Sequence, residues 1–406
     1  MFRRKAQEKN VAGPKPEVPY VIKDPKEFAT NLKIFLWLGY VYDGSLLSKV
    51  RISIFMFLVY TAPIHHMIPV FIDKDVSADQ ILTSVYLIQF YILLGSSWPF
   101  MVNSSKDIIE FGKSVQRGVF QYSVPYSDSE RRVLSETNDH VKRTTRISLI
   151  MYIAAGLITF SKELTPDSFR KFRPPYPGWF PWDINNNTGY AFALLYHFCL
   201  AVNTSMALEA NFILFGYLTI NYQGQFQLLK KHYVETFPPG LSPEEAYTDE
   251  HRTWTMNRLK DCIRHHLAIK QFHKMILRYF GVTLFVFRIV STVMLCIMAY
   301  LATTCTDPNK FVQLFGLAAG ILLLSIFCLS GETVMQVSED WRASVYEVDW
   351  WIQPVEVQKA ILLMQVGSSK PLTIFGIWKV TKFSHEGICV MCQETLGFFN
   401  MLRAMK

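Results

Sequence analysis

Seven apolar stretches, separated by polar segments, make up most of this 406-residue chain. A helix needs about 20 residues to cross the hydrocarbon layer of a bilayer, and most of these stretches reach or approach that length. The first contains Pro63 and Pro69, which membrane helices tolerate where neighbouring groups satisfy the freed backbone. The pattern predicts an all-α membrane protein with seven transmembrane helices, at 52–72, 80–102, 145–161, 190–222, 275–304, 311–335 and 372–406.

The helical pattern continues beyond the membrane after the fourth predicted span and stops at the Pro-Pro-Gly run of 238–240. Ser242 then reads as an N-cap, with Glu245 completing a capping box. No proline occurs between 244 and 306, so one helix there would be roughly 90 Å long, three times the thickness of the hydrocarbon layer. We therefore expect helices to project into solvent, and we predict shorter amphipathic helices at 28–42 and 355–365.

Composition and charge distribution fix the class and the orientation. Half of the residues are hydrophobic, 18% are charged and the mean hydropathy is +0.17, which is typical of a multi-span membrane protein. The net charge of +8 comes with no basic face interleaved with aromatic side chains, so we predict no nucleic-acid partner. Lys and Arg number ten, eight and nine in 1–51, 103–146 and 223–278, but one, four and one in 73–80, 162–189 and 305–310. The first three segments should be cytoplasmic, which places the amino terminus inside and, after seven spans, the carboxyl terminus outside.

The same orientation separates two glycosylation sequons. Asn186 lies in a predicted outside loop and is the predicted glycosylation site. Asn103 lies on the predicted inside, so we expect it to remain unmodified.

No sequence motif predicts catalysis, a cofactor or a metal site. Cys389 and Cys392 have redox spacing, but without a second ligand pair they are better explained as two small packing residues. His265 and His266 are adjacent and so do not share a helix face. A nucleophile elbow, an H-E-x-x-H motif and a dinucleotide fingerprint are all absent from the sequence. We therefore predict that the protein is not an enzyme.

The outer halves of spans two to six are rich in aromatic residues, methionine and small polar groups. Apolar pockets with a few polar groups hold small organic ligands, and methionine adapts to varied shapes. Ordinary helix packing, in which small residues are also common, is the alternative explanation. The candidate ligand-binding residues are Tyr86, Phe90, Tyr91, Tyr152, Gly156, Phe160, Tyr196, His197, Asn203, Thr204, Met294, Met298, Gln313, Phe315 and Gly316.

The last stretch, 372–406, contains ionisable residues that a lipid-facing helix would avoid. At about 100° per residue these side chains fall on one broad stripe of the predicted helix. The stripe either packs against polar groups of neighbouring helices or lines a water-filled path, and the two explanations fit equally well. Its members are Lys379, Lys382, Glu386, Val390, Gln393, Glu394, Gly397, Met401 and Ala404.

Several short motifs resemble the insect odorant receptor family in their order and spacing along essentially the whole chain. They are SVYEVDW at 344–350, KAILLM at 359–364, KPL at 370–372 and TLGFFNML at 395–402. The loop between spans four and five is short, which resembles a ligand-tuned subunit rather than the coreceptor of that family. Gustatory receptors, a related family, usually close with a Thr-Tyr start and a Gln-Phe end, from which Thr395-Leu396 and Arg403-Ala404 depart.

The resemblance implies an odorant-gated, non-selective cation channel in the plasma membrane of olfactory sensory neurons. Family members assemble as tetramers, usually with the coreceptor, around a pore lined by the seventh helix and held together by a cytoplasmic anchor domain. The expected segments are a cytoplasmic amino-terminal part with an amphipathic helix (1–51), spans one to four (52–222), a cytoplasmic helical extension (223–275), spans five and six (276–335), a cytoplasmic anchor segment (336–371) and the pore-lining helix (372–406).

The closing motif of the family would place the outer gate at Met401 and Met405. An apolar constriction of this kind can gate by dewetting, and Glu386 and Glu394 are candidates for favouring cations below it. A volatile, largely apolar ligand that binds the dilated arrangement better would shift the population toward the open state. A gustatory-type channel and a seven-helix receptor coupled to a G protein are the alternatives, and the second requires the opposite orientation.

Overall fold

The computed structural model describes residues 44–72, 78–105, 119–163, 171–304, 309–380 and 382–404, with the backbone alone at several positions, including 151 to 163. The helices are α2 (Leu46–Ile72), α3 (Ala78–Asn103), α5 (Asp128–Glu163), α7 (Asn187–Val234), α8 (Pro243–Ala246), α9 (Asp249–Thr304), α10 (Asn309–Glu347), α11 (Val355–Gly367) and α12 (His385–Ala404). Two 3-10 turns occur at Trp350–Ile352 and Ile377–Lys379. The predicted all-α class is confirmed, since the described residues add only an isolated bridge between Phe375 and Lys382. The predicted amphipathic helix at 28–42 lies outside the described residues.

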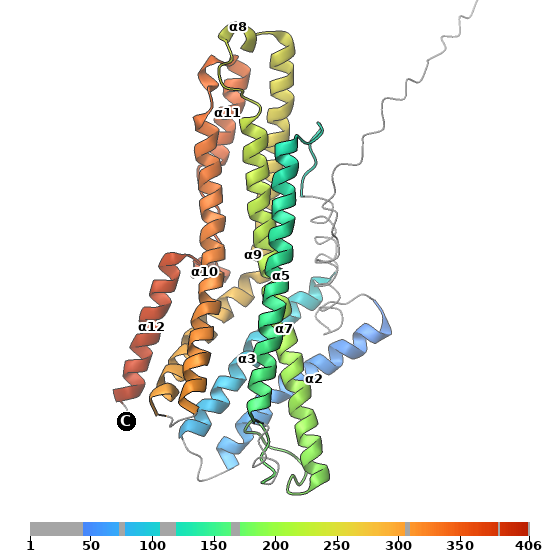
Figure 1. Cartoon of the computed structure of the whole chain (residues 1–406), viewed down its shortest axis with the longest axis vertical. Coiled ribbons are helices and arrows are strands. Elements are labelled where there is room, and N and C mark those ends of the chain that lie inside the picture. The colour runs from blue at the N-terminus through green and yellow to red at the C-terminus, as the bar shows by residue number, and fades with distance from the viewer. Residues whose placement is uncertain are drawn as a thin grey trace, which may run out of the picture.

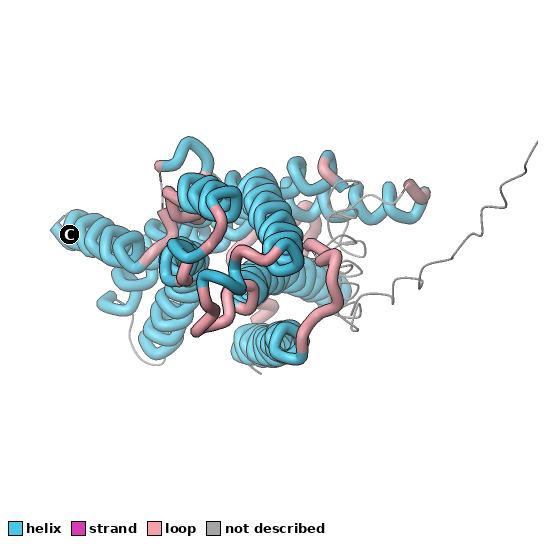
Figure 2. Tube along the Cα trace, turned by 90° about the horizontal axis from the view of Figure 1, so that it is seen from above, coloured by secondary structure: helices cyan, strands magenta, loops and turns pink. Residues whose placement is uncertain are grey.

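The helices form an elongated bundle in which α5, α7, α9 and α10 run lengthwise (Figure 1). Helices α2, α3 and α12 lie at one end, which we call the membrane bundle together with the adjoining parts of the long helices. Helices α8 and α11 lie at the other end, which we call the projecting bundle. Seen from above, the long helices appear end-on and α12 extends away from them (Figure 2).

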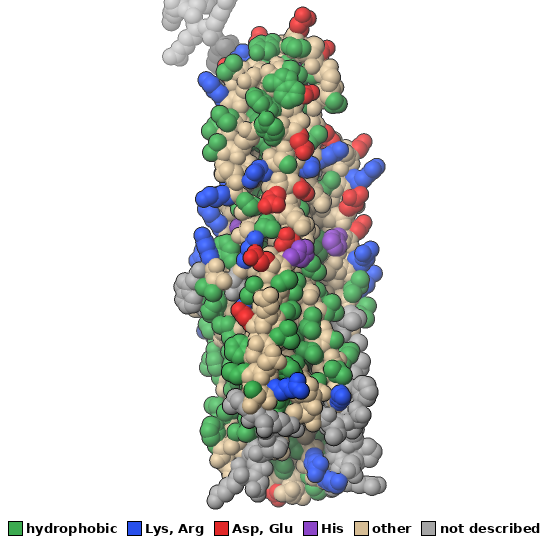
Figure 3. Space-filling model, turned by 90° about the vertical axis from the view of Figure 1, so that its left-hand side faces the viewer, with side chains coloured by type: hydrophobic (Ala, Val, Ile, Leu, Met, Phe, Trp, Pro, Cys, Tyr) green, Lys and Arg blue, Asp and Glu red, His purple; other side chains and the backbone are tan. Residues whose placement is uncertain are grey.

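Five of the described helices are long and apolar enough to cross a membrane: α2, α3, α7, α9 and α10. Helix α12 and the later part of α5 lie in the membrane bundle, alongside the apolar parts of these five (Figure 1). On the face seen in Figure 3, apolar side chains cover much of the membrane bundle, and most charged side chains gather on the projecting bundle. The chain is therefore a multi-pass membrane protein, while the total of seven spans stays a prediction.

Two helices are longer than the hydropathy pattern predicts. Helix α5 begins at Asp128 rather than near residue 145, and α10 continues to Glu347 rather than ending near residue 335. Each extension has a charged outer face and buries a narrow stripe, represented by Leu134 on α5 and Trp341 on α10. A search for continuous apolar runs misses such amphipathic extensions, because most of their residues face water.

The predicted helix start at Ser242 is confirmed, with both hydrogen bonds of the capping box to Glu245 present. The helix that follows is only one turn long, however, and α9 begins separately at Asp249. Helix α9 then runs unbroken for 56 residues, close to the predicted length.

The last helix begins at His385, not at residue 372 as the sequence pattern suggested. The segment before it is extended and turns, with Lys379 at a φ of 56° and Phe383 bonded through its N–H to the carbonyl of Ile374. A Cβ atom at Gly331 of α10 would lie 2.2 Å from the Phe383 carbonyl oxygen, so this segment rests directly on the α10 backbone. Lys379 and Lys382 therefore do not belong to the polar stripe of α12.

A buried carboxylate, Glu130, joins α5 to α7 and α9 in the projecting bundle. Its side chain is 1% exposed, accepts a hydrogen bond of 2.6 Å from His232 and lies 3.8 Å from the Arg258 guanidinium. Burial alone would raise the pKa of Glu130, but the hydrogen bonds from His232 and the Ser127 backbone, with the charge of Arg258, bring that pKa below its ordinary value. The projecting bundle thus holds a charged group that is fully paired.

A second network of ring contacts and hydrogen bonds joins the segment before α5 to α7 and α9. The Tyr122 ring stacks on His232 with centroids 3.7 Å apart, and its hydroxyl donates to Nδ1 of His265 over 2.7 Å. The opposite ring nitrogen of His265 donates to the Gln225 side-chain oxygen over 2.9 Å. Burial and the neighbouring His232 and His266 lower the pKa of His265 to about 3, so this imidazole is neutral.

Candidate functional site

The aromatic candidates on α3 make two sets of ring contacts. Tyr86 and Phe90 contact each other edge-on, with ring centroids 5.2 Å apart. Tyr91 stacks on His66 of α2, with ring centroids 5.9 Å apart, and lies beside Thr204 of α7. The structure therefore brings two predicted ligand residues, Tyr91 and Thr204, together.

Two adjacent histidines of α2 hold the loop that precedes α7. Nδ1 of His65 donates to the Trp179 carbonyl over 2.6 Å, and Nδ1 of His66 donates to the Pro177 carbonyl over 2.5 Å. The Trp179 N–H donates in return to the His65 carbonyl over 3.0 Å. The residue between them, Gly178, is required at this contact because a Cβ atom there would lie 1.9 Å from Nε2 of His65. This arrangement, which we call the histidine latch, fixes the loop 171–186 to α2.

His197 of α7, a predicted ligand residue, belongs to the latch. Its Nε2 lies 2.9 Å from Nε2 of His65, and Tyr196 contacts the His65 ring at a centroid distance of 5.1 Å. Its Nδ1 is buried and has no hydrogen-bond partner among the described residues. His197 was predictable from the sequence but its partners on α2 were not, because contacts between distant helices leave no mark in the local pattern.

A pocket of about 380 Å³ opens beside the latch. Two of its polar groups are already bonded, because the Thr61 hydroxyl donates to the Phe57 carbonyl and the Trp182 indole donates to the Gly189 carbonyl. What remains is an aromatic and aliphatic surface suited to an uncharged molecule. The lining residues are Phe57, Thr61, Ile64, His65, Ile68, Trp179, Phe180, Pro181, Trp182 and Tyr196.

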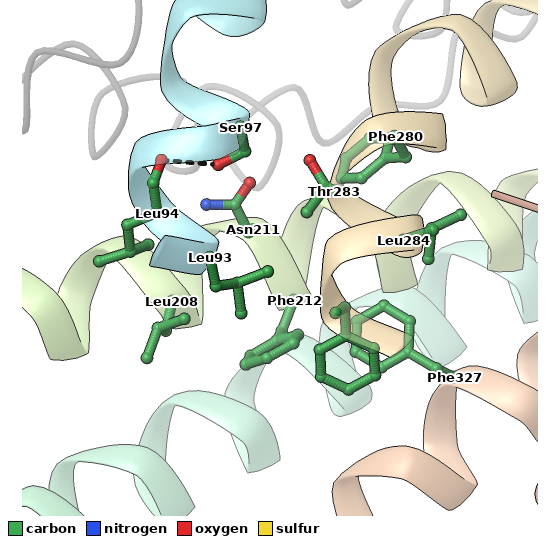
Figure 4. A pocket seen from close by; sticks show the side chains of 11 residues that line it. Leu93, Leu94, Ser97, Leu208, Asn211, Phe212, Phe280, Thr283, Leu284 and Phe327 are labelled. Carbon is green, nitrogen blue, oxygen red and sulfur yellow. Dashed lines mark hydrogen bonds between the residues drawn. The ribbon is translucent and has the colours of Figure 1, made fainter. Parts of the chain in front are cut away.

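A second, smaller cavity of about 20 Å³ lies in the membrane bundle (Figure 4). It occupies the meeting point of four helices, and although Ser97, Asn211 and Thr283 are among the residues around it, the surface exposed to it is apolar. The remaining lining residues are Leu93, Leu94, Leu208, Phe212, Phe280, Leu284, Phe287 and Phe327.

The candidates on α9 and α10 mainly pack the two helices together. A Cβ atom at Gly316 would lie 2.7 Å from Cε of Met298, and one at Gly320 would lie 3.2 Å from Cε of Met294. These methionines therefore fill the space that small residues of α10 leave open. Phe315 is 63% exposed and points away from this contact, and Gln313 is half-buried.

Two polar residues of α7 stand out for the partners they lack. Asn203, a predicted ligand residue, is half-buried, and its side-chain oxygen has no hydrogen-bond partner among the described residues. Glu209 is 6% exposed, forms no ion pair with a described residue and has a buried oxygen with no partner there. Glu209 is not among the residues predicted from the sequence, although an acidic residue within an apolar run is itself a sign of a functional position. Three further candidates, Tyr152, Gly156 and Phe160, lie on α5 outside the described side chains.

The last helix, α12, packs against α9 and α10 at the edge of the bundle (Figures 1 and 2). Its buried residue in the described part is Met391, while Met401 is 53% exposed. Glu394 is not free, because it lies 2.5 Å from the guanidinium of Arg288 on α9. Glu386 is exposed in the first turn of the helix, and Met405 lies outside the described residues.

The predicted glycosylation residue, Asn186, caps α7. Its side-chain oxygen accepts a hydrogen bond of 2.7 Å from the Gly189 N–H, and its amide nitrogen lies 3.2 Å from the Asp183 carbonyl. The residue is exposed, so its glycosylation stays a prediction.

Two curated relatives are named odorant receptors. The chain is 22% identical over 148 residues to Odorant receptor 85b of Drosophila melanogaster, and the match covers 36% of this chain and 38% of the relative. It is 21% identical over 151 residues to Odorant receptor 67a of the same species, with 37% of each chain covered. These matches therefore span less than two fifths of the relatives' own length.

Solved structures show the same fold over nearly the whole chain. The insect olfactory receptor OR5 from Machilis hrabei, in complex with eugenol, superposes with a TM-score of 0.78 at 14% identity, covering 94% of this chain and 98% of that one. The structure of the same receptor described without eugenol gives the same TM-score at 13% identity.

The family comparison covers most of the sequence. Residues 79–382 match the model of the family described as 7tm Odorant receptor. This range covers α5, α7, α9, α10, α11 and all but the first residue of α3. It therefore includes His197 of the histidine latch and the residues that line the small cavity. The chain therefore belongs to the odorant receptor family.

Proposed function

We propose that this chain is the ligand-tuned subunit of an odorant-gated, non-selective cation channel. The observation that carries the proposal is α12, a helix at the edge of the bundle that leaves most of its length unburied within the described chain. Its exposed side chains include apolar ones, Leu396 (60%), Phe398 (48%) and Met401 (53%), beside charged ones. A membrane helix with such a mixed exposed surface fits a position between neighbouring subunits and a water-filled pore.

The ligand we propose is a small, largely apolar volatile molecule bound in the outer half of the membrane bundle. The aromatic pair Tyr86 and Phe90, with Tyr91, Thr204 and Asn203, offers a mainly apolar surface with a few polar groups. Eugenol in the related receptor has this chemistry. The remaining candidate contacts are Tyr152, Gly156, Phe160, Tyr196, His197, Met294, Gln313, Phe315 and Gly316.

We propose a heterotetramer with the coreceptor in the plasma membrane of olfactory sensory neurons, with the amino terminus and the projecting bundle in the cytoplasm. The excess of Lys and Arg in the segments of that side supports this orientation. Helix α11 exposes Leu362 (57%), Leu363 (69%) and Val366 (65%), an apolar surface suited to contact between subunits.

The gate of this channel would lie at Met401 and Met405, near the end of α12. Ligand binding that favours a dilated arrangement of the bundle would shift the population toward a wetted, open gate. Because Glu394 is paired with Arg288, Glu386 is the better candidate for attracting cations.

The decisive experiment records membrane current from cells that express this chain with and without the coreceptor, during pulses of volatiles that include eugenol. We expect a ligand-evoked cation current in the presence of the coreceptor. A current that disappears when G-protein signalling is blocked would contradict the channel proposal and favour the G-protein-coupled alternative.

A second experiment addresses the gate. Met401→Glu and Met405→Glu should change conductance or ion preference, because a charge prevents dewetting of an apolar constriction. Met401→Leu is the matched control and should leave both properties close to wild type. Unchanged permeation in both glutamate variants would remove these residues from the pore.

A further inference from the structure

The pocket of about 380 Å³ beside the histidine latch follows one face of α2, and we call it the α2 groove. Four of its lining residues recur at intervals of three and four along that helix, which places them on the same side: Phe57, Thr61, Ile64 and Ile68. At 1.5 Å per residue they extend over about 16 Å, whereas the hydrocarbon layer of a bilayer is about 30 Å thick. The groove is therefore about as long as one leaflet of the bilayer is thick.

The loop before α7 covers the groove at the end of α2 that lies farther from the projecting bundle (Figure 1). The Trp179 N–H donates to the His65 carbonyl over 3.0 Å, which holds the loop against the last two turns of α2. Asp183 is exposed and directly follows Trp182, a lining residue. A carboxylate stays in water, and tryptophan is enriched where the bilayer meets water. The groove therefore begins at the aqueous boundary beside Trp182, and Phe57 lies deeper in the hydrocarbon layer.

The wall of the groove offers no charged partner to an occupant. None of its described lining residues is Asp, Glu, Lys or Arg. Both ring nitrogens of His65 are engaged, one by the Trp179 carbonyl and the other by His197. The Thr61 hydroxyl and the Trp182 indole donate to backbone carbonyls. A hydrocarbon occupant therefore leaves no charge uncompensated here and breaks none of these hydrogen bonds.

The groove is continuous with the surface that the membrane bundle presents to lipid. Phe57 and Ile64 of α2, and Phe192 and Leu195 of α7, are each more than half exposed and flank the groove residues of their helices. Exposed apolar surface of this extent marks contact with a membrane or a partner. Helix α2 lies on the opposite side of the bundle from α12 in Figure 1, away from the side on which α12 is exposed. This surface therefore faces the lipid of the bilayer.

We infer that the α2 groove is a binding site for one acyl chain of a phospholipid. The headgroup stays in water beside Trp182, and the chain extends along α2 toward Phe57. The length of the groove equals the depth that such a chain occupies in one leaflet. A file of side chains along a single helix suits a flexible chain, because the rigid fused rings of a sterol need a broader flat surface.

A bound chain supports the histidine latch. His65 lines the groove and also holds the loop and His197, so the chain packs directly on the latch. A lipid that binds only the folded receptor raises its unfolding temperature by mass action. Of the candidate odorant contacts, only Tyr196 lines the groove, and the inference does not depend on the proposed channel function.

Tryptophan quenching tests the site in the purified full chain. The delipidated protein in detergent is titrated with phosphatidylcholine whose acyl chains carry bromine, which quenches tryptophan fluorescence on contact. We expect quenching that saturates near one lipid per chain, because Trp179 and Trp182 line the groove. The double variant Trp179→Phe with Trp182→Phe should lose this saturable part. Quenching that only rises in proportion to the lipid content of the micelles would show general lipid contact and overturn the inference.

Thr61→Phe fills the groove and should abolish both the saturable quenching and the rise of the unfolding temperature with added lipid. The hydrogen bond that it removes joins Thr61 to the backbone of its own helix. Thr61→Leu, a smaller change, keeps the test available if Thr61→Phe does not fold. Ile54→Phe is the matched control, since Ile54 is exposed on the same helix but does not line the groove. Equal saturable quenching in Thr61→Phe and Ile54→Phe would contradict a chain in the groove.

Two further ligands separate the phospholipid from other occupants. A brominated sterol should give no saturable quenching, and eugenol should not displace the brominated phosphatidylcholine. Saturable quenching by the sterol in place of the phospholipid, or displacement by eugenol, would assign the groove to a different ligand and overturn the inference. A structure in phosphatidylcholine nanodiscs should show elongated density along α2 from Ile68 to Phe57.

Discussion

The two ends of the molecule bury a carboxylate in opposite ways. In the projecting bundle, Glu130 is bonded to His232 and the Ser127 backbone and lies beside Arg258. In the membrane bundle, Glu209 is nearly as buried, yet no described residue forms an ion pair with it. The first arrangement fixes α5, α7 and α9 relative to one another, whereas Glu209 keeps an oxygen without a hydrogen-bond partner among the described residues.

This difference teaches where the protein is rigid and where it can respond. Paired buried charges hold one geometry, because any displacement leaves a charge uncompensated. Glu209 of the membrane bundle forms no ion pair with a described residue, and one of its oxygens has no hydrogen-bond partner there. A displacement of its helix therefore breaks no charge pair at Glu209, whereas the same displacement at Glu130 would.

The largest effect is expected from Glu130→Ala. Removing the carboxylate leaves His232 without its acceptor and the Arg258 guanidinium, which donates to Thr236 and the His232 carbonyl, without its counter-charge. Breaking a buried pair in this way costs about 3–5 kcal/mol of unfolding free energy. Denaturant titration in detergent measures the loss. The control is Glu136→Ala, an exposed residue of the same helix, which should change little. Equal losses in the two variants would mean that Glu130 does not hold the bundle together.

The pH dependence of stability tests the same region through His265. The folded pKa of His265 is about 3, well below its ordinary value of 6.5, so the unfolded chain binds the extra proton between these values. The stability that the neutral ring provides is complete above pH 6.5 and is lost as the pH falls, by about 2 kcal/mol between pH 7 and pH 5. In His265→Gln the fall over this interval should be smaller by that amount.

The control for this pH experiment is His140→Gln, since His140 is exposed on α5. Its pH dependence should match that of the wild type. A wild-type stability that does not change between pH 7 and pH 5 would show that His265 is not buried as a neutral ring.

Gly178→Ala tests the histidine latch. The added Cβ would lie 1.9 Å from Nε2 of His65, whose ring is held by Trp179 and His197 and cannot simply turn away. Overpacking of this kind costs about 1–3 kcal/mol, measured as a lower unfolding temperature. Gly216→Ala on α7 is the control, because a Cβ atom there meets no atom within 4 Å. A variant as stable as wild type would show that the loop is not fixed to α2.

The smallest effect is expected from Glu209→Leu, which sharpens the comparison with Glu130. No described partner is left behind, and an apolar side chain suits the surroundings, so stability should stay within about 1 kcal/mol of wild type or increase. The same titration as for Glu130→Ala measures it. A loss as large as that of Glu130→Ala would reveal a partner for Glu209 and end the distinction between the two regions.

Long, regular features were predictable from sequence. The predicted spans 52–72 and 80–102 match α2 and α3 within a few residues at each end, except that α2 begins at Leu46. The extension of α7 to Val234 and the capping box at Ser242 were also predicted correctly. These features rest on local signals, namely apolar runs of the right length and capping residues at fixed spacing.

The sites were only partly predictable. His197 and Asn203 were selected for their place in an apolar outer half, but the histidines of α2 and Glu209 were not. The polar stripe of the last stretch lost Lys379 and Lys382, because the helix begins at His385, and Glu394 proved to be paired with Arg288. In each case the deciding contact joins residues far apart in the chain.

The sequence by itself determined the class of protein, the extent of most helices and the resemblance that the family comparison confirmed, because hydropathy, helix signals and short motifs are properties of neighbouring residues. The tertiary structure alone decided that two histidines of α2 hold a distant loop, that Glu130 is paired while Glu209 is not, and that Ser97, Asn211 and Thr283 lie around one small cavity. These arrangements depend on how long helices align side by side, where a rotation of one helix changes which side chains meet.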